Sequence, residues 1–229
     1  MSCFRSIYPG VENLPANFNL PRHRHLRAYA TVVLGGAFEE AGYAGRIQAS
    51  VGDLLIHPIL DCHVDRMITP GLRLLRLPWP DAETTGGFHR LSDLDQVVRI
   101  AEKDILEAQM LLLEITGHGK QTSTPMDDWF DMLAHDIKSN PTLSIGEWAD
   151  NHGMARETVS RGFSRVWGIP PASFRAEWRA RTAWLRLTSG NECLSAVASG
   201  TGFADQAHMT RWISRTTGST PAIWKNWHR

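Results

Sequence analysis

The spacing of apolar residues changes near residue 90 and divides the chain into two kinds of predicted structure. Between about residues 20 and 80, short apolar and β-branched runs such as YATVVLGG and LRLLRLP lie between glycine-containing turns. Runs of this length predict β-strands, and several in succession favour a small sandwich or barrel. After Leu91 the apolar residues recur at intervals of three and four, which predicts helix. We therefore expect an α+β chain of two domains, a β-barrel with a helix followed by an all-α domain.

A heptad stripe opens the helical part and predicts one long helix over residues 91–117. Its positions are Leu91, Leu94, Val98, Ala101, Ile105, Ala108, Leu112 and Ile115. Such a stripe pairs with a second copy of the chain or packs on its own β domain; we favour the first alternative and expect a homodimer. The polar stretch GHGKQTSTP then predicts a linker over residues 118–126. The domains on either side of the helix and linker are 1–90 and 127–229.

The C-terminal domain contains two copies of one segment, LSIGEWADNHGMARETVSRGFSRVWGIPPASF and CLSAVASGTGFADQAHMTRWISRTTGSTPAIW. Corresponding residues stand 49 or 50 positions apart, in the pairs Ala149 and Ala198, Gly153 and Gly202, Arg161 and Arg211, Phe163 and Ile213, Pro171 and Pro221. The spacing increases after the glycine, so the second copy has one extra residue in its turn. The repeat predicts that both copies form the same local structure.

Each copy has the pattern of a helix-turn-helix. Ser144 and Glu147 form a capping box at the start of the first helix, and a small inward alanine allows the second helix to cross closely. The glycine tolerates the positive φ of a tight turn. In the second helix, Val159 and Phe163 face inward one turn apart, which leaves Arg161 outside. Met209, Ile213 and Arg211 repeat this arrangement. A helix over about residues 172–187 connects the two copies.

The net charge of zero hides an asymmetry between the two domains. Residues 152–229 hold eleven Lys or Arg and four Asp or Glu, a net charge of +7, so the rest of the chain carries −7. A cationic segment of this kind predicts a module that binds a polyanion, although an ordinary solvated surface is an alternative.

Residues 127–229 resemble the C-terminal DNA-binding domain of AraC/XylS-type transcription regulators. The likeness is most specific in GFADQAHMTRWISRTTGSTPAIW, with its GF, its arginine and its G-x-x-P-x-x-aromatic end. One departure is Ile213, where the family often has an aromatic residue. The resemblance implies a seven-helix domain whose two recognition helices enter successive major grooves of double-stranded promoter DNA. It also implies RNA polymerase as a further partner.

The resemblance carries a set of DNA contacts onto the two recognition helices. The residues expected to contact bases are Glu157, Ser160, Arg161, Gln206, Ala207, Thr210 and Arg211. Those expected to contact the phosphate backbone are Arg156, Arg165 and Arg215. The chemistry agrees, since arginine bonds guanine through two atoms, glutamine suits adenine, and alanine can meet a thymine methyl group. A helical repeat that binds protein is the alternative interpretation.

In the N-terminal domain, PRHRHLRAYA places His23 and His25 on one face of a predicted strand. The segment GDLLIHPILDCHVDRM adds Pro58 and, five residues later, His63. An HxH pair followed by G-x5-P and a third histidine resembles the two motifs of the cupin barrel. Barrels of that kind form the N-terminal sensor in many AraC-type regulators. Residues 1–90 are therefore expected to be a cupin-like sensor domain.

The chain departs from metal-binding cupins at two places, with Tyr29 and Ala30 where a glutamate is expected and Leu60 where a glycine is expected. Three histidines can still hold Zn²⁺ or Fe²⁺ with open coordination positions, and His57 and Cys62 are further ligands nearby. The alternative is that His23, His25 and His63 donate hydrogen bonds in a pocket for an organic ligand. The expected effector is accordingly a small molecule or a metal, and no cofactor is certain.

We expect a regulator with no catalytic residues, because the other half of the chain is committed to DNA. One rival interpretation is a metal-dependent cupin enzyme of dioxygenase or isomerase type. A second is an architectural DNA binder without a sensing function. No apolar run reaches the length of a membrane span, MSCFRSIYPG lacks the pattern of a signal peptide, and the three cysteines form no CxxC spacing. We therefore expect a cytoplasmic protein with no membrane contact.

Overall fold

The structure is a computed structural model that describes residues 3–4, 8–16, 19–81, 86–118 and 128–226. The chain divides between Pro125 and Met126 into two compact units. The N-terminal unit is built of strands with two helices and the C-terminal unit of helices, so the predicted α+β two-domain fold is confirmed. The predicted linker lies outside the described residues, except for His118, which ends a helix.

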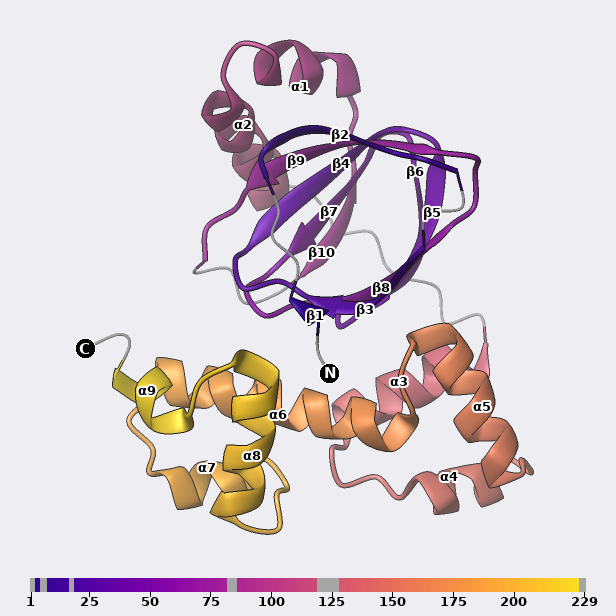
Figure 1. Cartoon of the computed structure of the whole chain (residues 1–229), viewed down its shortest axis with the longest axis vertical. Helices are drawn as coiled ribbons and strands as arrows, with labels where there is room; N and C mark the ends of the chain where they lie inside the picture. Colours follow the sequence, from indigo (N-terminus) through magenta and orange to yellow (C-terminus); the bar gives the residue numbers. More distant parts are fainter. Residues whose placement is uncertain (1–2, 5–7, 17–18, 82–85, 119–127, 227–229) are drawn as a thin grey trace. The chain divides into compact units, whose positions relative to one another are not determined.

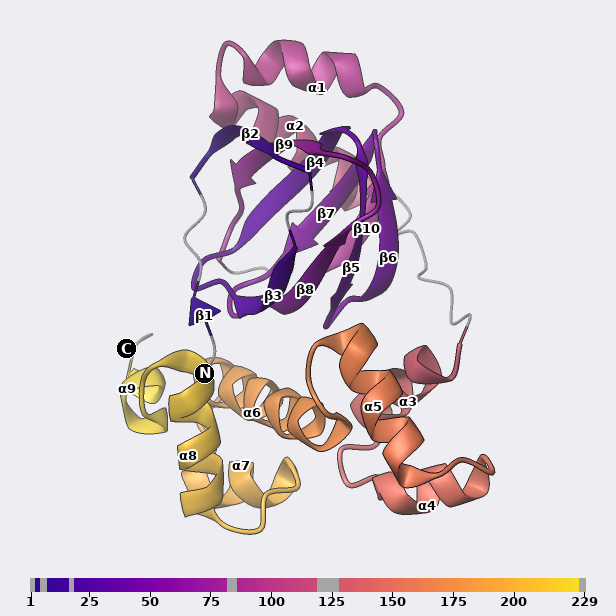
Figure 2. The same cartoon turned by 45° about the vertical axis from the view of Figure 1, so that its right-hand side comes forward.

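The strands of the N-terminal unit are short, as the runs between turns predict. They are β1 (Cys3–Phe4), β2 (Gly10–Leu14), β3 (Leu20–Arg24), β4 (Tyr29–Gly35), β5 (Ala37–Gly42), β6 (Gly45–Ser50), β7 (Asp53–His57), β8 (Cys62–Met67), β9 (Leu72–Pro78) and β10 (Gly87–Arg90). Within the described part they form two sheets, ordered β1-β3-β8-β5-β6 and β10-β7-β4-β9-β2. Figures 1 and 2 show the sheets facing each other as the walls of a barrel.

Alternation along the strands separates two hydrophobic clusters on opposite faces of the second sheet. Ala30 and Val32 of β4 belong to the cluster that packs under the helices. Val33 of β4, Leu55 of β7 and Leu74 of β9 belong to a second cluster with residues of β5 and β6 from the other sheet, which places it inside the barrel. Because successive side chains of a strand point to opposite faces, every second residue along each of these strands also faces the inside of the barrel.

Two helices, α1 (Leu94–Ala101) and α2 (Ile105–His118), stand where one long helix over 91–117 was predicted, so that prediction is wrong. The chain turns at residues 102–104, and the Asp104 carboxylate accepts the Leu106 backbone N–H at 2.8 Å to start α2. Because of this turn α1 packs back on α2, and α2 packs on β9 of the second sheet (Figures 1 and 2).

The apolar stripe packs on its own β domain, which was the second of the two alternatives for it. Val97 of α1 and Ala108 and Leu112 of α2 are fully buried in the cluster under the second sheet. Leu106 and Met110 of α2 face away from it and are 59% and 65% exposed. The homodimer stays a prediction.

The C-terminal unit contains seven helices among its described residues. They are α3 (Trp129–Ser139), α4 (Ile145–Asn151), α5 (Arg156–Trp167), α6 (Pro171–Ser189), α7 (Leu194–Gly200), α8 (Gln206–Thr217) and α9 (Pro221–Asn226). Both repeats thus form a short helix, a turn and a longer helix, as predicted. Figures 1 and 2 show α4 and α5 at one end of α6. The helices α7, α8 and α9 lie at its other end.

Aromatic side chains hold α6 to both repeats. Phe174 at the start of α6 lies with its ring 5.4 Å from Phe163 and 5.2 Å from Trp167 of α5. Near the other end of α6, Trp184 meets Trp224 of α9 edge to face at 5.5 Å. Aromatic pairs in this geometry contribute about 0.5–1.5 kcal/mol beyond their burial, so α6 fixes the spacing of the two repeats.

The docking of α2 on the β domain gives a stability prediction. Leu112→Ala should lower the free energy of unfolding by about 2–5 kcal/mol, because it leaves a cavity at a fully buried position. Glu107→Ala, at an exposed acidic position of the same helix, is the control and should change stability by less than about 0.5 kcal/mol. Urea unfolding followed by circular dichroism measures both. A loss in Leu112→Ala that depends on protein concentration would show that the stripe packs on a second copy instead.

Candidate functional site

The turns of the two helix-turn-helix units have the same backbone geometry. Gly153 has φ +65° and Gly202 has φ +76°, so the predicted positive φ is confirmed at both. In each turn the residue after the glycine donates its backbone N–H to the carbonyl of the alanine in the preceding helix. The distance is 2.9 Å to Ala149 in the first unit and 3.0 Å to Ala198 in the second. Side chains other than glycine rarely adopt this φ, so the glycines fix the angle at which α5 and α8 leave the turn.

The two units differ by one residue in the turn, as the spacing of the repeat predicts. Helix α5 begins three residues after Gly153, whereas α8 begins four residues after Gly202. In the second unit the added room is used by Asp205, whose carboxylate accepts the His208 backbone N–H at 2.6 Å and caps α8. The cap of α5 is Ala155, which has no side-chain acceptor.

The structure places every predicted DNA-contacting residue on the outer side of α5 or α8. Glu157, Arg161, Gln206, Ala207, Arg211, Arg156, Arg165 and Arg215 are exposed, and Ser160 and Thr210 are half-buried. The inward residues Val159, Phe163, Met209 and Ile213 are fully buried. Ile213 therefore keeps the packing role of the family's aromatic residue. The DNA contacts themselves stay predictions.

Much of the positive charge of this unit is bound by the protein itself. The pairs are Arg175 with the Leu143 carbonyl, Arg179 with the Pro141 carbonyl, Arg186 with Glu192, and Arg156 with Asp150. Arg161 and Arg211 differ, since neither guanidinium has a hydrogen-bond or ion-pair partner among the described residues. The net charge of this unit is therefore larger than the charge that remains available to bind a polyanion. Arg161 and Arg211 are the arginines best placed for such binding.

The sequence did not single out an aromatic group on α8. Trp212 is half-buried, and its indole N–H lies 3.1 Å from Nε2 of His208 one helical turn earlier. The Arg215 guanidinium lies over the Trp212 ring at 5.2 Å from its centre. The spacing of His208 and Trp212 at i and i+4 was the available signal. This contact orients Arg215, one of the predicted phosphate contacts.

In the N-terminal unit the three predicted histidines meet inside the barrel. His23 of β3 pairs directly with His63 of β8, and His25 follows the end of β3. The three side chains are 4%, 2% and 1% exposed, and one nitrogen of each lies within 4.8 Å of the others. The arrangement fits a divalent metal ion, because imidazoles gathered this closely can share one ion.

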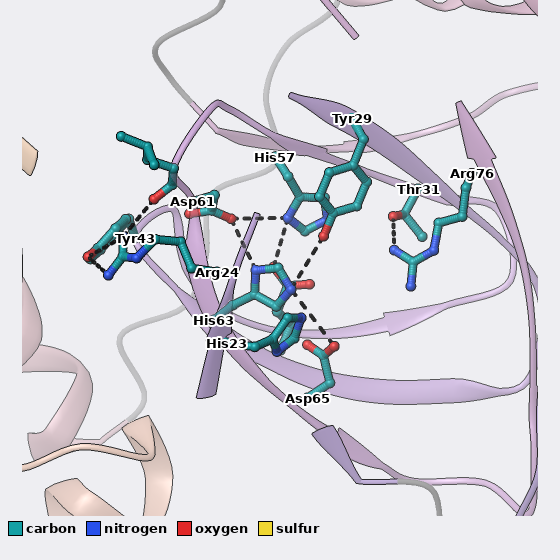
Figure 3. A network of polar contacts seen from close by, with 12 residues as sticks. His23, Arg24, Tyr29, Thr31, Tyr43, His57, Asp61, His63, Asp65 and Arg76 are labelled. Carbon is teal, nitrogen blue, oxygen red and sulfur yellow. Dashed lines mark hydrogen bonds and ion pairs between the residues drawn. The ribbon is translucent and has the colours of Figure 1, made fainter. Parts of the chain in front are cut away.

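Four further ionisable side chains lie beside the three histidines and were not predicted as a group. Asp61 accepts from Nδ1 of His57 at 3.1 Å and from Nδ1 of His63 at 3.2 Å (Figure 3). Glu40 of β5 lies with Oε1 3.7 Å from His57 Nδ1, and Asp65 with Oδ2 3.8 Å from His63 Nε2. The sequence named only His57 of these, because the others come together through strand pairing.

Burial shifts the pKa values of this group in different directions. Burial raises the pKa of Glu40 to about 8, and it lowers the pKa of His57 to about 4 in spite of the Asp61 hydrogen bond. Burial alone would also raise the pKa of Asp61, but hydrogen bonds from His57 and His63 outweigh it and hold this pKa well below its usual value. Burial opposes the charge of His63 too, yet the nearby carboxylates raise its pKa.

Tyr29 and Leu60 stand at the two positions where the sequence departs from the cupin motifs, and both contribute to the buried polar group. Tyr29, in place of the glutamate, turns its hydroxyl to His63 Nε2 at 3.4 Å, and burial raises its pKa well above the usual value, so it stays a neutral phenol. Leu60, in place of the glycine, has φ +60° and is the one non-glycine residue with positive φ in the described part of the chain. Its carbonyl accepts from the fully buried Arg24 at 2.8 Å, which fixes this turn.

Comparison with known proteins supports the helix-turn-helix assignment. Residues 148–226 match a family model described as a helix-turn-helix domain. The chain is similar to the uncharacterized HTH-type transcriptional regulator YobQ of Bacillus subtilis, 31% identical over 84 residues, which is 37% of this chain and 35% of YobQ. It is 33% identical to the HTH-type transcriptional regulator RipA of Corynebacterium glutamicum over 92 residues, 39% of this chain and 28% of RipA. The matched part is thus about a third of these relatives.

Two solved structures also align with the chain. Fatty-acid-bound ToxT from Vibrio cholerae aligns over 94% of this chain and 93% of its own, with 10% identity and a TM-score of 0.43. A probable AraC family transcriptional regulator from Rhodopseudomonas palustris aligns over 42% of this chain and 94% of its own, with 21% identity and a TM-score of 0.40.

The C-terminal unit therefore carries a helix-turn-helix domain of the class found in transcription regulators. The family model and the two relatives confirm the predicted helix-turn-helix assignment for this domain. The rival interpretation as a cupin enzyme gains no support from them. Among the described residues, none of the helices is long and apolar enough to cross a membrane.

The positive φ of the first turn gives a prediction. Gly153→Ala should lower the free energy of unfolding of the C-terminal unit by about 1–2 kcal/mol, through backbone strain alone, because an added Cβ meets nothing within 4 Å. Gly153→Asn is the control and should cost less, since asparagine tolerates this conformation. Eight of the nine tryptophans follow residue 126, so tryptophan fluorescence during urea unfolding measures this unit. Equal stability of the alanine variant and the parent would contradict the assigned turn.

Proposed function

We propose that this protein is a cytoplasmic transcription regulator that binds double-stranded promoter DNA through α5 and α8. The observation that supports it best is a helix-turn-helix domain in which each recognition helix carries an exposed arginine, Arg161 or Arg211, that has no hydrogen-bond or ion-pair partner among the described residues. A guanidinium free to move can bond N7 and O6 of a guanine in the major groove. The remaining exposed polar residues of α5 and α8 supply further contacts to bases and phosphates.

The N-terminal unit is proposed as the sensor of this regulator. Its barrel interior holds a buried group of ionisable side chains, which is costly to fold and is more common at binding sites than in a structural core. The proposed effector is a small molecule or a divalent metal ion such as Zn²⁺ or Fe²⁺, with His23, His25 and His63 as its ligands. A bound metal would supply a positive charge that orders this end of the barrel.

A homodimer is proposed as the form that binds DNA. Leu106 and Met110 lie one turn apart on the outer side of α2 and are both more than half exposed. An apolar pair of this kind suits a helix contact with a second copy, which would place two C-terminal units on neighbouring DNA segments. RNA polymerase is the proposed partner at the promoter.

The DNA-binding proposal predicts a specific loss. Arg211→Ala should weaken binding to the preferred site by about 1–3 kcal/mol and relax the choice of base at one position, because one base contact is removed. The preferred site is first selected from random double-stranded DNA with the full chain, and affinities are then measured by fluorescence anisotropy at fixed salt. Arg99→Ala, an exposed arginine of α1, removes the same charge and is the control.

Three outcomes would be informative in that experiment. Unchanged affinity and base preference in Arg211→Ala would contradict base recognition by this side chain. Equal affinity of the parent for selected and random DNA would favour the architectural binder. Affinity for the selected site should also fall steeply with salt, because contacts to phosphates release counterions.

A further inference from the structure

A second group of possible metal ligands lies next to the three histidines and shares one member with them. It consists of Glu40, His57, Asp61 and His63, from four different segments of the barrel, all buried. One ligand atom of each lies within 4.8 Å of the others. Oδ1 of Asp61 is buried and has no hydrogen-bond partner among the described residues, so the hydrogen-bonding capacity of this carboxylate is not filled.

Three distances within this group are close to the edge of a metal tetrahedron. His57 Nδ1 and His63 Nδ1 lie 3.1 and 3.2 Å from Asp61 Oδ2, and Glu40 Oε1 lies 3.7 Å from His57 Nδ1. Ligands about 2.0–2.2 Å from a tetrahedral ion stand about 3.3–3.6 Å from one another. We propose that Glu40, His57, Asp61 and His63 form a binding site for a divalent transition-metal ion.

Charge favours this group over the three-histidine group. An ion held by three neutral imidazoles has no anionic ligand, and the carboxylates of Asp61 and Asp65, which lie beside His63, would balance its charge only from a distance. In the proposed site the carboxylates of Glu40 and Asp61 neutralise the charge of the ion at the ligands themselves. Two imidazoles with two carboxylates suit Zn²⁺, Fe²⁺ or Co²⁺ better than Mg²⁺ or Ca²⁺, which prefer oxygen ligands alone.

Protons balance when the ion enters this site. An ionised Asp61 only accepts, so Nδ1 of His57 and of His63 each carry a proton before binding. The ion takes the place of the proton on Nδ1. In a neutral imidazole that proton moves to Nε2, a doubly protonated imidazole releases it to solvent and keeps the one on Nε2, and a protonated Glu40 carboxyl releases its own proton to solvent when it binds the ion. For His63, Nε2 faces Asp65 Oδ2 at 3.8 Å and the Tyr29 hydroxyl at 3.4 Å, and both oxygens can accept a hydrogen bond from it. Such outer partners orient a ligating histidine.

The two groups cannot be filled together through His63. A neutral imidazole has one nitrogen with a free lone pair, so His63 serves one ion at a time. The site proposed here is therefore an alternative to the three-histidine ligand set of the proposed sensor. The two sets can be told apart by variants, because Glu40, His57 and Asp61 belong only to the first and His23 and His25 only to the second. It concerns the N-terminal unit alone, so its failure would leave the DNA-binding proposal standing.

Metal titration of the full chain tests the site. Zn²⁺ affinity is measured by competition with a chromophoric chelator after metal has been removed, and Co²⁺ is used as a second probe whose visible absorption reports nitrogen and oxygen ligands. Glu40→Gln and Asp61→Asn should each weaken Zn²⁺ binding at least about tenfold. Zn²⁺ should raise the melting temperature of the parent more than that of either variant.

Two control variants make the result specific. Glu39→Gln changes the neighbouring acid of β5, which pairs with Arg46 and Arg66 rather than with the histidines, and His23→Gln changes only the three-histidine group. Glu39→Gln should keep the affinity of the parent, whereas His23→Gln tells the two ligand sets apart, because it weakens Zn²⁺ binding only if the three histidines hold the ion. Loss of binding in His23→Gln with retention in Glu40→Gln would assign the ion to the three histidines and overturn the proposal. Absence of Zn²⁺ and Co²⁺ binding by the parent would overturn it too.

Metal-free melting curves show whether each variant folds. Glu40→Gln keeps the shape of the side chain, and if it does not fold, Asp61→Asn decides the question. DNA affinity, measured with and without Zn²⁺, is recorded separately. A parent that binds Zn²⁺ with the predicted pattern but does not bind DNA would support this site and contradict the proposed regulator.

Discussion

The N-terminal unit depends on one constraint, which is that its second sheet is covered on both faces. Helices α1 and α2 cover the outer face, so that face must be apolar, and the pleat then sends every other residue of β4, β7 and β9 into the barrel. One part of the interior is filled by the cluster around Val33, Leu55 and Leu74. The other part holds the histidines and carboxylates. The second sheet contributes His57 of β7 to this group at an inward position of the pleat, and the facing first sheet contributes His23, Glu40 and His63.

The sequence predicted the parts of this site that follow from local periodicity. Two histidines one residue apart share a face of any strand, and the G-x5-P spacing located His63 correctly beside them. Glu40 and Asp61 could not be found in this way. Glu40 belongs to β5, whose pairing with β8 brings it opposite Asp65, and Asp61 stands in the turn before β8. Which strands pair across a sheet is decided by the whole chain, and no local pattern in the sequence shows it.

In the helical part too, features that depend on neighbouring residues were predicted, and contacts between residues far apart in the sequence were not. The repeat predicted both turns, the inward residues and the outward arginines, because each depends on a few neighbouring residues. The break between α1 and α2 was missed because Glu102, Lys103 and Asp104 include neither proline nor glycine, and the apolar stripe continues through them. The cap formed by Asp104 was the available signal. Internal partners of the arginines, such as the Leu143 carbonyl for Arg175, were equally invisible before folding.

The extra residue in the second turn makes the two recognition helices unlike each other in start, cap and outward side chains. Helix α5 presents Glu157 and an arginine paired with Asp150, whereas α8 presents Gln206 and Ala207 after an aspartate cap. A domain built from two such unequal halves has a head and a tail. If it binds promoter DNA as proposed, the two halves would meet different bases, and a single chain would then distinguish upstream from downstream.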